Sequence, residues 1–162
     1  MRHHTIHPTL ALIATVALLA ACAFQLPGTN PVDPGLSEAR KTVVSNATAQ
    51  INAPYRYGGT DRKGFGNAGL MHFAYAAAGI GIPNRTPGQL RAGRPIEFGE
   101  ALPGDLLFYR LSDTGDAEPH VGMFIGSGEM VHASVDRDQV VLETVDNAFW
   151  QKRLAAVIRI LP

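Results

Sequence analysis

Two histidines and one helix start are the places where this sequence could support covalent catalysis. His120 opens the apolar run "HVGMFIG" and His132 lies inside "EMVHAS", and both runs are typical of β-strands. A helix-like run, "LMHFAYAAAG", directly follows "GFGNAG". Acyl transfer by a protein nucleophile uses a nucleophile, a histidine base and a third group that orients the base. A nucleophile at a helix N-terminus, facing two strand histidines, would complete such a site.

The nucleophile itself is absent from the helix start. Residues 66–69 read "GNAG", with no Cys, Ser or Thr, and the Asn67 amide is not a nucleophile at neutral pH. Asn is among the most favourable N-cap residues, worth about 1 kcal/mol over Ala. We therefore expect Asn67 to cap the helix, with contact between its amide and a bound peptide as the alternative.

Two helices precede the strands and must position this site. The first is predicted to begin after the N-cap Ser37 and to end at Pro54, and the second to run from about residue 68 to residue 78, with Gly79 as its C-terminal cap. The glycine-rich segment between them, "YRYGGTDRKGFG", is predicted to be a loop.

Five short runs rich in β-branched and aromatic residues follow: "DLLFYR", "HVGMFIG", "EMVHAS", "QVVLET" and "AAVIRI". The "LPGD" before the first run is typical of a type II turn. Helices followed by strands indicate an α+β fold, with N-terminal helices packed on a five-stranded, mostly antiparallel sheet. Strand alternation allows His120 and His132 to project towards the helix that begins near Ala68.

The N-terminal region has the pattern of an export signal. Residues 1–21 carry a basic start and an apolar run that is shorter than the roughly 20 residues of a membrane span, which predicts a secretory signal peptide. "LAAC" resembles the lipobox of bacterial lipoproteins, which implies lipid attachment at Cys22, the chain's only cysteine. Residues 22–35 are predicted to be a flexible tether and residues 36–162 the folded domain. An ordinary signal peptide is the alternative.

The residue after Cys22 and the composition set further expectations. Ala23 stands where an Asp would favour the inner membrane, so the resemblance implies anchoring in the outer membrane, facing the periplasm. The 14 basic and 14 acidic residues form no basic stripe, which argues against nucleic acid as a partner. Two histidines without a suitably spaced carboxylate make a poor zinc site, so we expect no metal and no cofactor.

Residues 55–160 resemble the NlpC family of papain-like cell-wall peptidases. The matching pieces occur in the family's order: "YRYGG", "GFGNAGL", "AGIGIPNRTPGQ", "LPGDLLFY", "HVGMFIGSGEMVHAS" and "FWQKR" with "AVIRI". The resemblance implies a papain-like domain that acts on peptidoglycan stem peptides, commonly between D-glutamate and diaminopimelate. It assigns the base to His120, the orienting residue to His132 and the tyrosine of the family's "YxYGG" motif to Tyr55.

The departure from the family falls on the nucleophile. Where the family has Asp-Cys-Ser-Gly, Asn67 replaces the Cys, with Gly66 and Ala68 beside it. We therefore expect no enzyme activity, but a lipid-anchored module that binds stem peptides through Tyr55, Asn67 and the two histidines, or regulates a cell-wall enzyme. One alternative is an active hydrolase with a non-cysteine mechanism, such as a histidine-activated water. Another is a structural lipoprotein whose own side chains fill the cleft, the retained histidines and tyrosine being relics.

Overall fold

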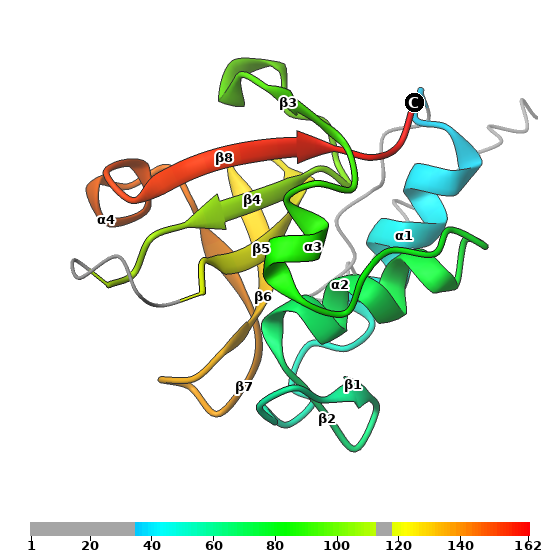
Figure 1. Ribbon diagram of the computed structural model, residues 1–162, viewed down its shortest axis with the longest axis vertical. Coiled ribbons are helices and arrows are strands. Elements are labelled where there is room, and N and C mark those ends of the chain that lie inside the picture. The colour runs from blue at the N-terminus through cyan, green and yellow to red at the C-terminus, as the bar shows by residue number, and fades with distance from the viewer. Residues whose placement is uncertain (1–34, 113–117) are drawn as a thin grey trace, which may run out of the picture. The chain divides into compact units, whose positions relative to one another are not determined.

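A six-stranded antiparallel sheet with two helices on one face forms the domain in the computed structural model, which describes residues 35–112 and 118–162 (Figure 1). The predicted signal peptide, residues 22–34 of the predicted tether and the predicted lipidation residue Cys22 lie outside the described residues. Within the described ranges, no helix is long and apolar enough to cross a membrane.

Helix α1 spans Glu38–Thr48 and begins where the sequence predicts. The Ser37 hydroxyl accepts a hydrogen bond from the backbone N–H of Arg40 at 3.4 Å, which satisfies one of the free N–H groups of the first turn. The helix ends well before Pro54, since Ala49 is already its C-cap.

Helix α2 spans Asn67–Ala76 and packs against α1 and against the central strands. Its C-terminal end is closed by Gly79, whose φ of 74° is a left-handed conformation that glycine adopts without steric cost. The N–H of Ile80 then reaches the carbonyl of Tyr75 at 3.1 Å, as in a Schellman cap. Shorter helices are α3 (Thr86–Gln89), η1 (Phe98–Glu100) and α4 (Ala148–Gln151).

The predicted strands all form, and the sheet has one strand more than the five expected. Its order is β3-β8-β4-β5-β6-β7. The unexpected strand, β3, lies at the sheet edge and contains Pro95. Because proline cannot donate a ladder hydrogen bond, its presence argues against a strand when the sequence alone is considered. The bounds are β3 Arg94–Ile96, β4 Leu106–Tyr109, β5 His120–Gly126, β6 Glu129–Ser134, β7 Gln139–Thr144 and β8 Leu154–Arg159.

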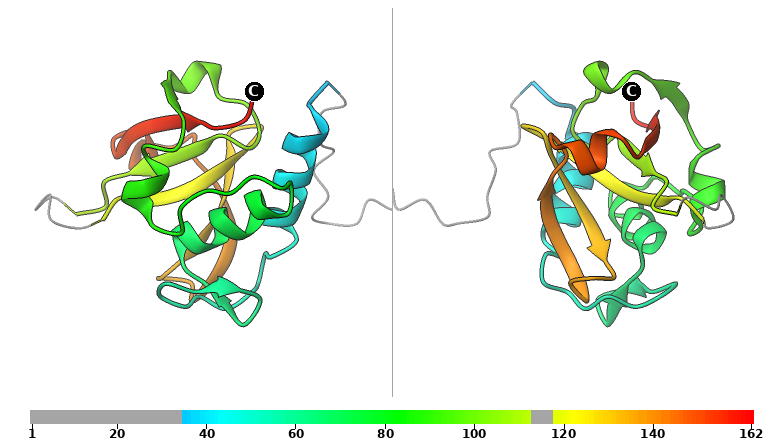
Figure 2. Two further views of the ribbon diagram at one scale, coloured as in Figure 1. Left: turned by 45° about the vertical axis from the view of Figure 1, so that its right-hand side comes forward. Right: turned by 90° about the vertical axis from the view of Figure 1, so that its left-hand side faces the viewer.

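The two faces of the sheet are covered differently. Helices α1 and α2 lie on the same side, as the two views of Figure 2 show, and close the main apolar core. The other face carries a smaller cluster around Tyr109 and Trp150, where α4 packs. A separate two-stranded hairpin, β1 (Thr60–Asp61) and β2 (Gly64–Phe65), precedes α2.

A buried carboxylate joins the beginning and the end of the domain. Asp105 follows the predicted turn, in which Gly104 has the positive φ of a type II turn, 96°. The carboxylate accepts hydrogen bonds from Arg40 on α1 at 3.1 Å and from Arg159 on β8 at 2.7 Å. The first helix and the last strand are therefore fixed to the same turn.

Candidate active site

Asn67 is the first residue of α2 and does not cap it. The N-cap is Gly66, which has no side chain to offer, and the amide of Asn67 instead points to the sheet, where Nδ2 lies 2.8 Å from Nδ1 of His120. The prediction that Asn67 caps the helix is therefore wrong. A side chain that reaches the sheet cannot also fold back onto the N–H groups of its own first turn.

A continuous chain of hydrogen bonds runs from Asn67 across three strands. Nε2 of His120 on β5 lies 2.9 Å from Nδ1 of His132 on β6, and Nε2 of His132 lies 2.9 Å from a carboxylate oxygen of Glu143 on β7. The hydrogen-bond chain thus joins three of the four predicted site residues, all but Tyr55, and adds Glu143. The missing signal was the register of β6 with β7, which pairs His132 with Val141 and sets Glu143 diagonally across.

Burial keeps the imidazole rings uncharged at neutral pH. Only 7% of His120 and 2% of His132 is exposed. Burial lowers the pKa of His120 to about 3, helped by the neighbouring His132 ring. Burial also lowers the pKa of His132, against the opposing effect of Glu143. A neutral imidazole carries one unprotonated nitrogen, so each ring can accept a proton.

Trp150 covers the histidine pair on the side of the sheet away from α1 and α2. Its ring centroid lies 5.8 Å from that of His120 and 5.6 Å from that of His132. This packing has a consequence for the site, because the indole limits water access to the hydrogen bond between the two rings.

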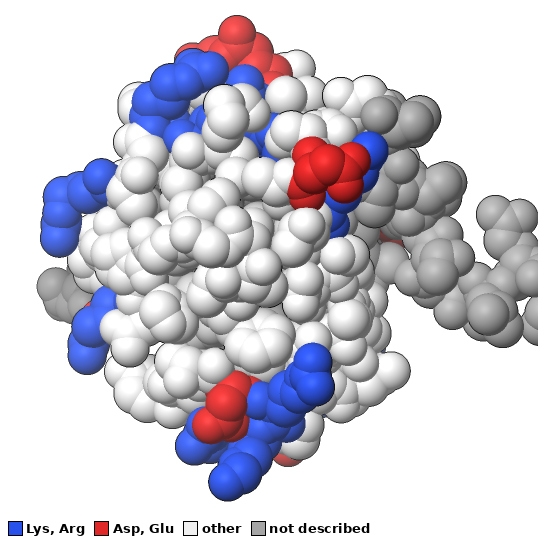
Figure 3. Space-filling model, turned by 90° about the vertical axis from the view of Figure 1, so that its right-hand side faces the viewer, with Lys and Arg blue, Asp and Glu red and all other residues white. Residues whose placement is uncertain are grey.

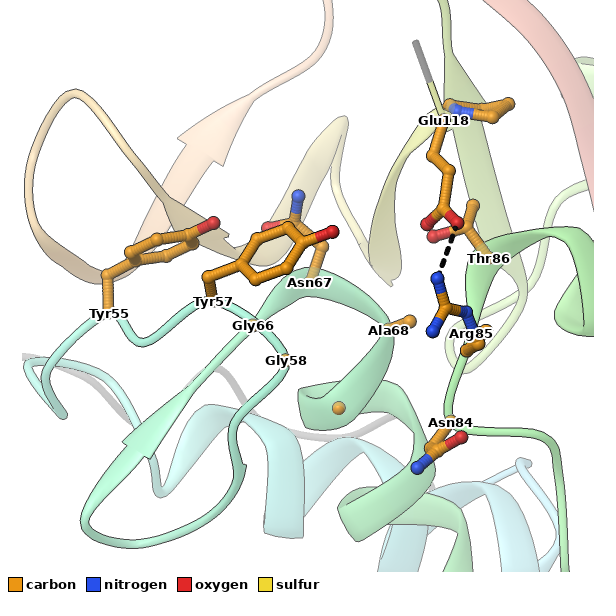
Figure 4. Close-up of a pocket in the computed structure, with 12 residues that line it drawn as sticks. Tyr55, Tyr57, Gly58, Gly66, Asn67, Ala68, Asn84, Arg85, Thr86 and Glu118 are labelled. Carbon is orange, nitrogen blue, oxygen red and sulfur yellow. Dashed lines mark hydrogen bonds and ion pairs between the residues drawn. The ribbon is translucent and has the colours of Figure 1, made fainter.

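A pocket of about 370 Å³ opens at the start of α2. Tyr55 and Tyr57 line one side of it, and an ion pair between Arg85 and Glu118, with a separation of 3.2 Å, lines the other (Figure 4). Asn67 lies between the two sides (Figure 4). His120 is not among the lining residues and contacts the Asn67 amide. The pocket is open, which disfavours the alternative in which the domain's own side chains fill the cleft.

Close backbone contacts hold the pocket in shape. Gly69 in the first turn of α2 packs against the carbonyl of Gly59 so closely that a Cβ would overlap it. The buried amide of Gln89 donates to the carbonyls of Ala68 and Pro83, each at 2.7 Å, and so fixes the segment that carries Arg85 beside α2. The glycine-rich motif therefore serves close packing of the loop on the helix.

The sequence analysis identified Tyr55, Asn67 and the two histidines, but it did not identify the Arg85–Glu118 ion pair that lines one side of the pocket. Arg85 and Glu118 are far apart in the chain and belong to segments without a regular pattern, so only the fold brings them together. No group of three or more His, Cys, Asp or Glu side chains within residues 35–112 and 118–162 is placed to hold a metal ion. Charges of both signs are interspersed around an uncharged centre on the face shown in Figure 3.

A helix N-terminus set against a histidine pair on an antiparallel sheet is the arrangement of a papain-like fold. The chain belongs to the NlpC/P60 family, whose sequence model matches residues 52–159. The resemblance seen in the sequence is therefore confirmed.

Relatives of known name agree with this assignment. The chain is 32% identical to murein DD-endopeptidase MepH of Escherichia coli over 78% of this chain and 48% of that protein. It is 30% identical to the probable endopeptidase NlpC of the same organism over 92% and 97% of the two chains. The peptidoglycan hydrolase RipB of Mycobacterium tuberculosis has the same fold, with a TM-score of 0.64 and 31% identity over 76% of this chain and 65% of that one. The chain thus spans about half the length of MepH and nearly all of NlpC.

These relatives correct the prediction that the chain is not an enzyme. That prediction depended on Asn67 and on the neighbouring Gly66 and Ala68, and the matched proteins are named as endopeptidases and as a peptidoglycan hydrolase. The family to which the chain belongs is thus one of hydrolases. His120 and His132, to which the resemblance assigns the base and the orienting residue, are hydrogen-bonded to each other, and His120 to Asn67.

Proposed function

We propose that this domain hydrolyses peptide bonds in peptidoglycan stem peptides, with water as the nucleophile and His120 as the base. The observation that carries the proposal is the hydrogen-bond chain from Asn67 to Glu143, which ends at an open pocket. The names of the relatives support peptidoglycan as the substrate class.

The two sides of the pocket suit a short, charged peptide. Tyr55 and Tyr57 offer aromatic faces and hydroxyl groups to the peptide backbone, and 84% of Tyr57 is exposed and free to contact it. Arg85 can form charge-assisted hydrogen bonds with a carboxylate, and Glu118 with an ammonium group. Stem peptides carry both groups, so the Arg85–Glu118 pair can exchange its internal contact for contacts with the ligand.

The water is placed by the side chain that replaces the family's thiol. Oδ1 of Asn67 is buried and has no hydrogen-bond partner among the described residues. When the amide turns away from His120, a water between the two residues donates one hydrogen to Oδ1 of Asn67 and the other to Nδ1 of His120. That water satisfies the unpaired oxygen and faces the pocket.

The reaction then proceeds by general base and general acid catalysis. The water oxygen bonds to the substrate carbonyl carbon while its proton passes to Nδ1 of His120. Nδ2 of Asn67 and the free N–H groups of the first turn of α2 stabilise the oxygen on which negative charge develops. The carbon–nitrogen bond breaks as the imidazolium returns the proton to the leaving nitrogen, which gives a carboxylate and an amine. A pKa near 3 makes His120 a weak base, so we expect slow turnover.

Digestion of purified sacculi by the full-length chain tests the proposal. Mass spectrometry should detect new amine and carboxylate ends in the released peptides, and His120→Ala should abolish them. The matched control is His72→Gln, because His72 bonds to the carbonyl of Ile82 and does not line the pocket.

Two results would contradict this mechanism. Binding of soluble muropeptides without any product would remove hydrolysis and leave recognition alone. Loss of activity on chelation, or equal activity in His120→Ala, would exclude His120 as the group that activates the water.

A further inference from the structure

The hydrogen-bond chain from Asn67 to Glu143 has a direction that its first three members do not determine. A side-chain amide offers both a donor and an acceptor, and a neutral imidazole has one N–H and one bare nitrogen. Nδ2 of Asn67 donates to His120 in this structure, but a half-turn of the amide would place the acceptor Oδ1 against the same ring nitrogen. With that turn allowed, the contacts of His120 and His132 permit donation towards Glu143 or towards α2. In one direction His120 presents a bare Nδ1 to Asn67, and in the other it presents N–H.

Glu143 differs from the other members because an ionised carboxylate only accepts hydrogen bonds. Its contact with His132 is 2.9 Å long, so Nε2 of His132 must carry the hydrogen. Nδ1 of His132 is then bare and accepts from Nε2 of His120. Nδ1 of His120 is in turn bare and accepts from the Asn67 amide.

We propose that Glu143 is a positioning residue that sets the tautomers of both histidines and so leaves Nδ1 of His120 unprotonated towards the pocket. Its effect reaches the pocket only through the two rings, since Glu143 itself is not among the residues that line it. The catalytic meaning of this arrangement rests on the proposed hydrolysis, whereas the tautomers do not depend on it.

The surroundings of the rings favour such control. Both histidines are nearly fully buried and Trp150 packs against them, so little water is available as an alternative donor or acceptor. The low pKa of His120 keeps its ring neutral over the physiological pH range. Only a neutral ring has two alternative tautomers, because a protonated ring carries a hydrogen on both nitrogens. The Glu143 side chain is 39% exposed, so water also stabilises the ionised form of its carboxylate.

Nuclear magnetic resonance of the full-length chain with 15N-labelled histidine tests this directly. In the wild type, Nδ1 of both His120 and His132 should resonate as unprotonated nitrogens, with assignments taken from His120→Gln and His132→Gln. Glu143→Gln is the decisive variant, because glutamine has the same shape and can either accept from His132 or donate to it. The Nδ1 resonance of His120 should then shift towards the position of a protonated nitrogen.

Matched variants distinguish a change in the direction of the hydrogen bonds from the loss of a negative charge and from a loss of folding stability. Glu97→Gln removes the same charge at an exposed position away from the pocket and should leave the resonances unchanged. Glu143→Asp keeps a carboxylate, which only accepts hydrogen bonds, and should therefore show the wild-type tautomers. The thermal midpoint of Glu143→Gln should stay close to that of the wild type.

Two outcomes would overturn the proposal: a wild-type His120 with protonated Nδ1, or a Glu143→Gln variant with wild-type tautomers. Since the readout needs no turnover, a lack of hydrolysis by a chain with the expected tautomers would contradict only the proposed function. If the chain does hydrolyse muropeptides, Glu143→Gln should lower kcat and leave KM nearly unchanged.

Discussion

At the residue scale, position 67 decides what the histidine pair can act on. The Asn67 amide occupies the place at the helix start where the family has a thiol, and it lies at hydrogen-bond distance from His120. His120, the base of the proposed mechanism, and His132 and Glu143 behind it form an unbroken hydrogen-bond chain from this position. In that mechanism the replacement changes the nucleophile from a thiol to water and keeps a proton acceptor beside position 67.

The buried, neutral His120 should make stability depend on pH. The unfolded chain binds a proton at this histidine below about pH 6.5, whereas the folded chain does not until about pH 3. The unfolded state therefore holds more protons in this window, and the free energy of unfolding falls as the pH is lowered from 6.5 towards 3. His120→Gln should remove a slope of up to about 1.4 kcal/mol per pH unit. Urea unfolding of both proteins across the window measures it, and parallel curves would contradict a neutral, buried His120.

Asn67→Cys should create a reactive thiol next to the base. The helix N-terminus favours negative charge, and Nδ1 of His120 can accept the thiol proton. In a Cys22→Ser background, we expect faster alkylation of the new thiol than of free cysteine, and faster release of peptides from sacculi than by the parent chain. Because the family's Asp and Ser beside the thiol are also missing, adding Gly66→Asp and Ala68→Ser should raise the cleavage rate further. An unreactive thiol would show that His120 does not accept a proton from the side chain at position 67.

The sequence identified site residues whose types are rare and whose spacing is local. His120 and His132 stand out because each interrupts an apolar strand, and Asn67 because it begins a helix. Glu143 could not be identified in this way, since a glutamate on a half-exposed strand is ordinary and only the register with β6 sets it beside His132. The cap prediction for Asn67 failed because propensity ignores a partner that is distant in the chain.

At the element scale, the glycines around the pocket act through backbone contact. A Cβ on Gly69 in α2 would overlap the carbonyl of Gly59 in the preceding loop, and a Cβ on Gly59 would overlap the carbonyl of Gly64 in β2. The loop that carries Tyr55 and Tyr57 is therefore held directly on the first turn of α2. This contact fixes the position of Tyr55 and Tyr57, which line one side of the pocket, relative to Asn67.

Gly69→Ala should therefore destabilise the domain and disturb the pocket. The added Cβ meets the backbone of Gly59, which cannot rotate away as a side chain could. Overpacking of this kind costs about 1–3 kcal/mol. The matched control is Gly81→Ala, where a Cβ meets nothing within 4 Å. Denaturant unfolding of the two variants compares them, and equal midpoints would refute the contact.

The order of elements was predictable, and the exception has a clear cause. The Ser37 cap, the Gly79 cap and the five apolar runs each gave local signals that the structure confirms. Strand β3 gave none, because it is short, exposed and interrupted by Pro95. It forms through its pairing with β8, which is a partner far along the chain.

At the scale of the whole molecule, we propose that Cys22 anchors the chain to a membrane. The proposal rests on the motif "LAAC" at the end of the apolar N-terminal run. Expressed in a bacterium with a lipoprotein pathway, the chain should incorporate a palmitate analogue, and Cys22→Ser should not. Fractionation should then move the variant from the membrane to the soluble periplasmic fraction. Equal labelling of both proteins would remove the lipidation proposal.

Asp105 should be the charge on which the integrity of the domain depends most. It is fully buried and receives hydrogen bonds from Arg40 and Arg159, which belong to the first helix and the last strand. Asp105→Asn keeps the shape but leaves two guanidinium groups without their counter-charge. Removal of one partner from a buried ion pair costs about 3–5 kcal/mol, so the variant should unfold at much lower denaturant concentration.

The matched control for this prediction is Asp61→Asn, which breaks the ion pair with Arg56. Both side chains of that pair are about half exposed, 55% and 50%, so the change should cost less than about 1 kcal/mol. Added salt should weaken the Asp61 pair further and leave the Asp105 contribution nearly unchanged, because ions in solution screen exposed charges far more than buried ones. If the two variants lost similar stability, or if salt reduced the Asp105 contribution, the carboxylate would not be the buried link between α1 and β8 that the geometry indicates.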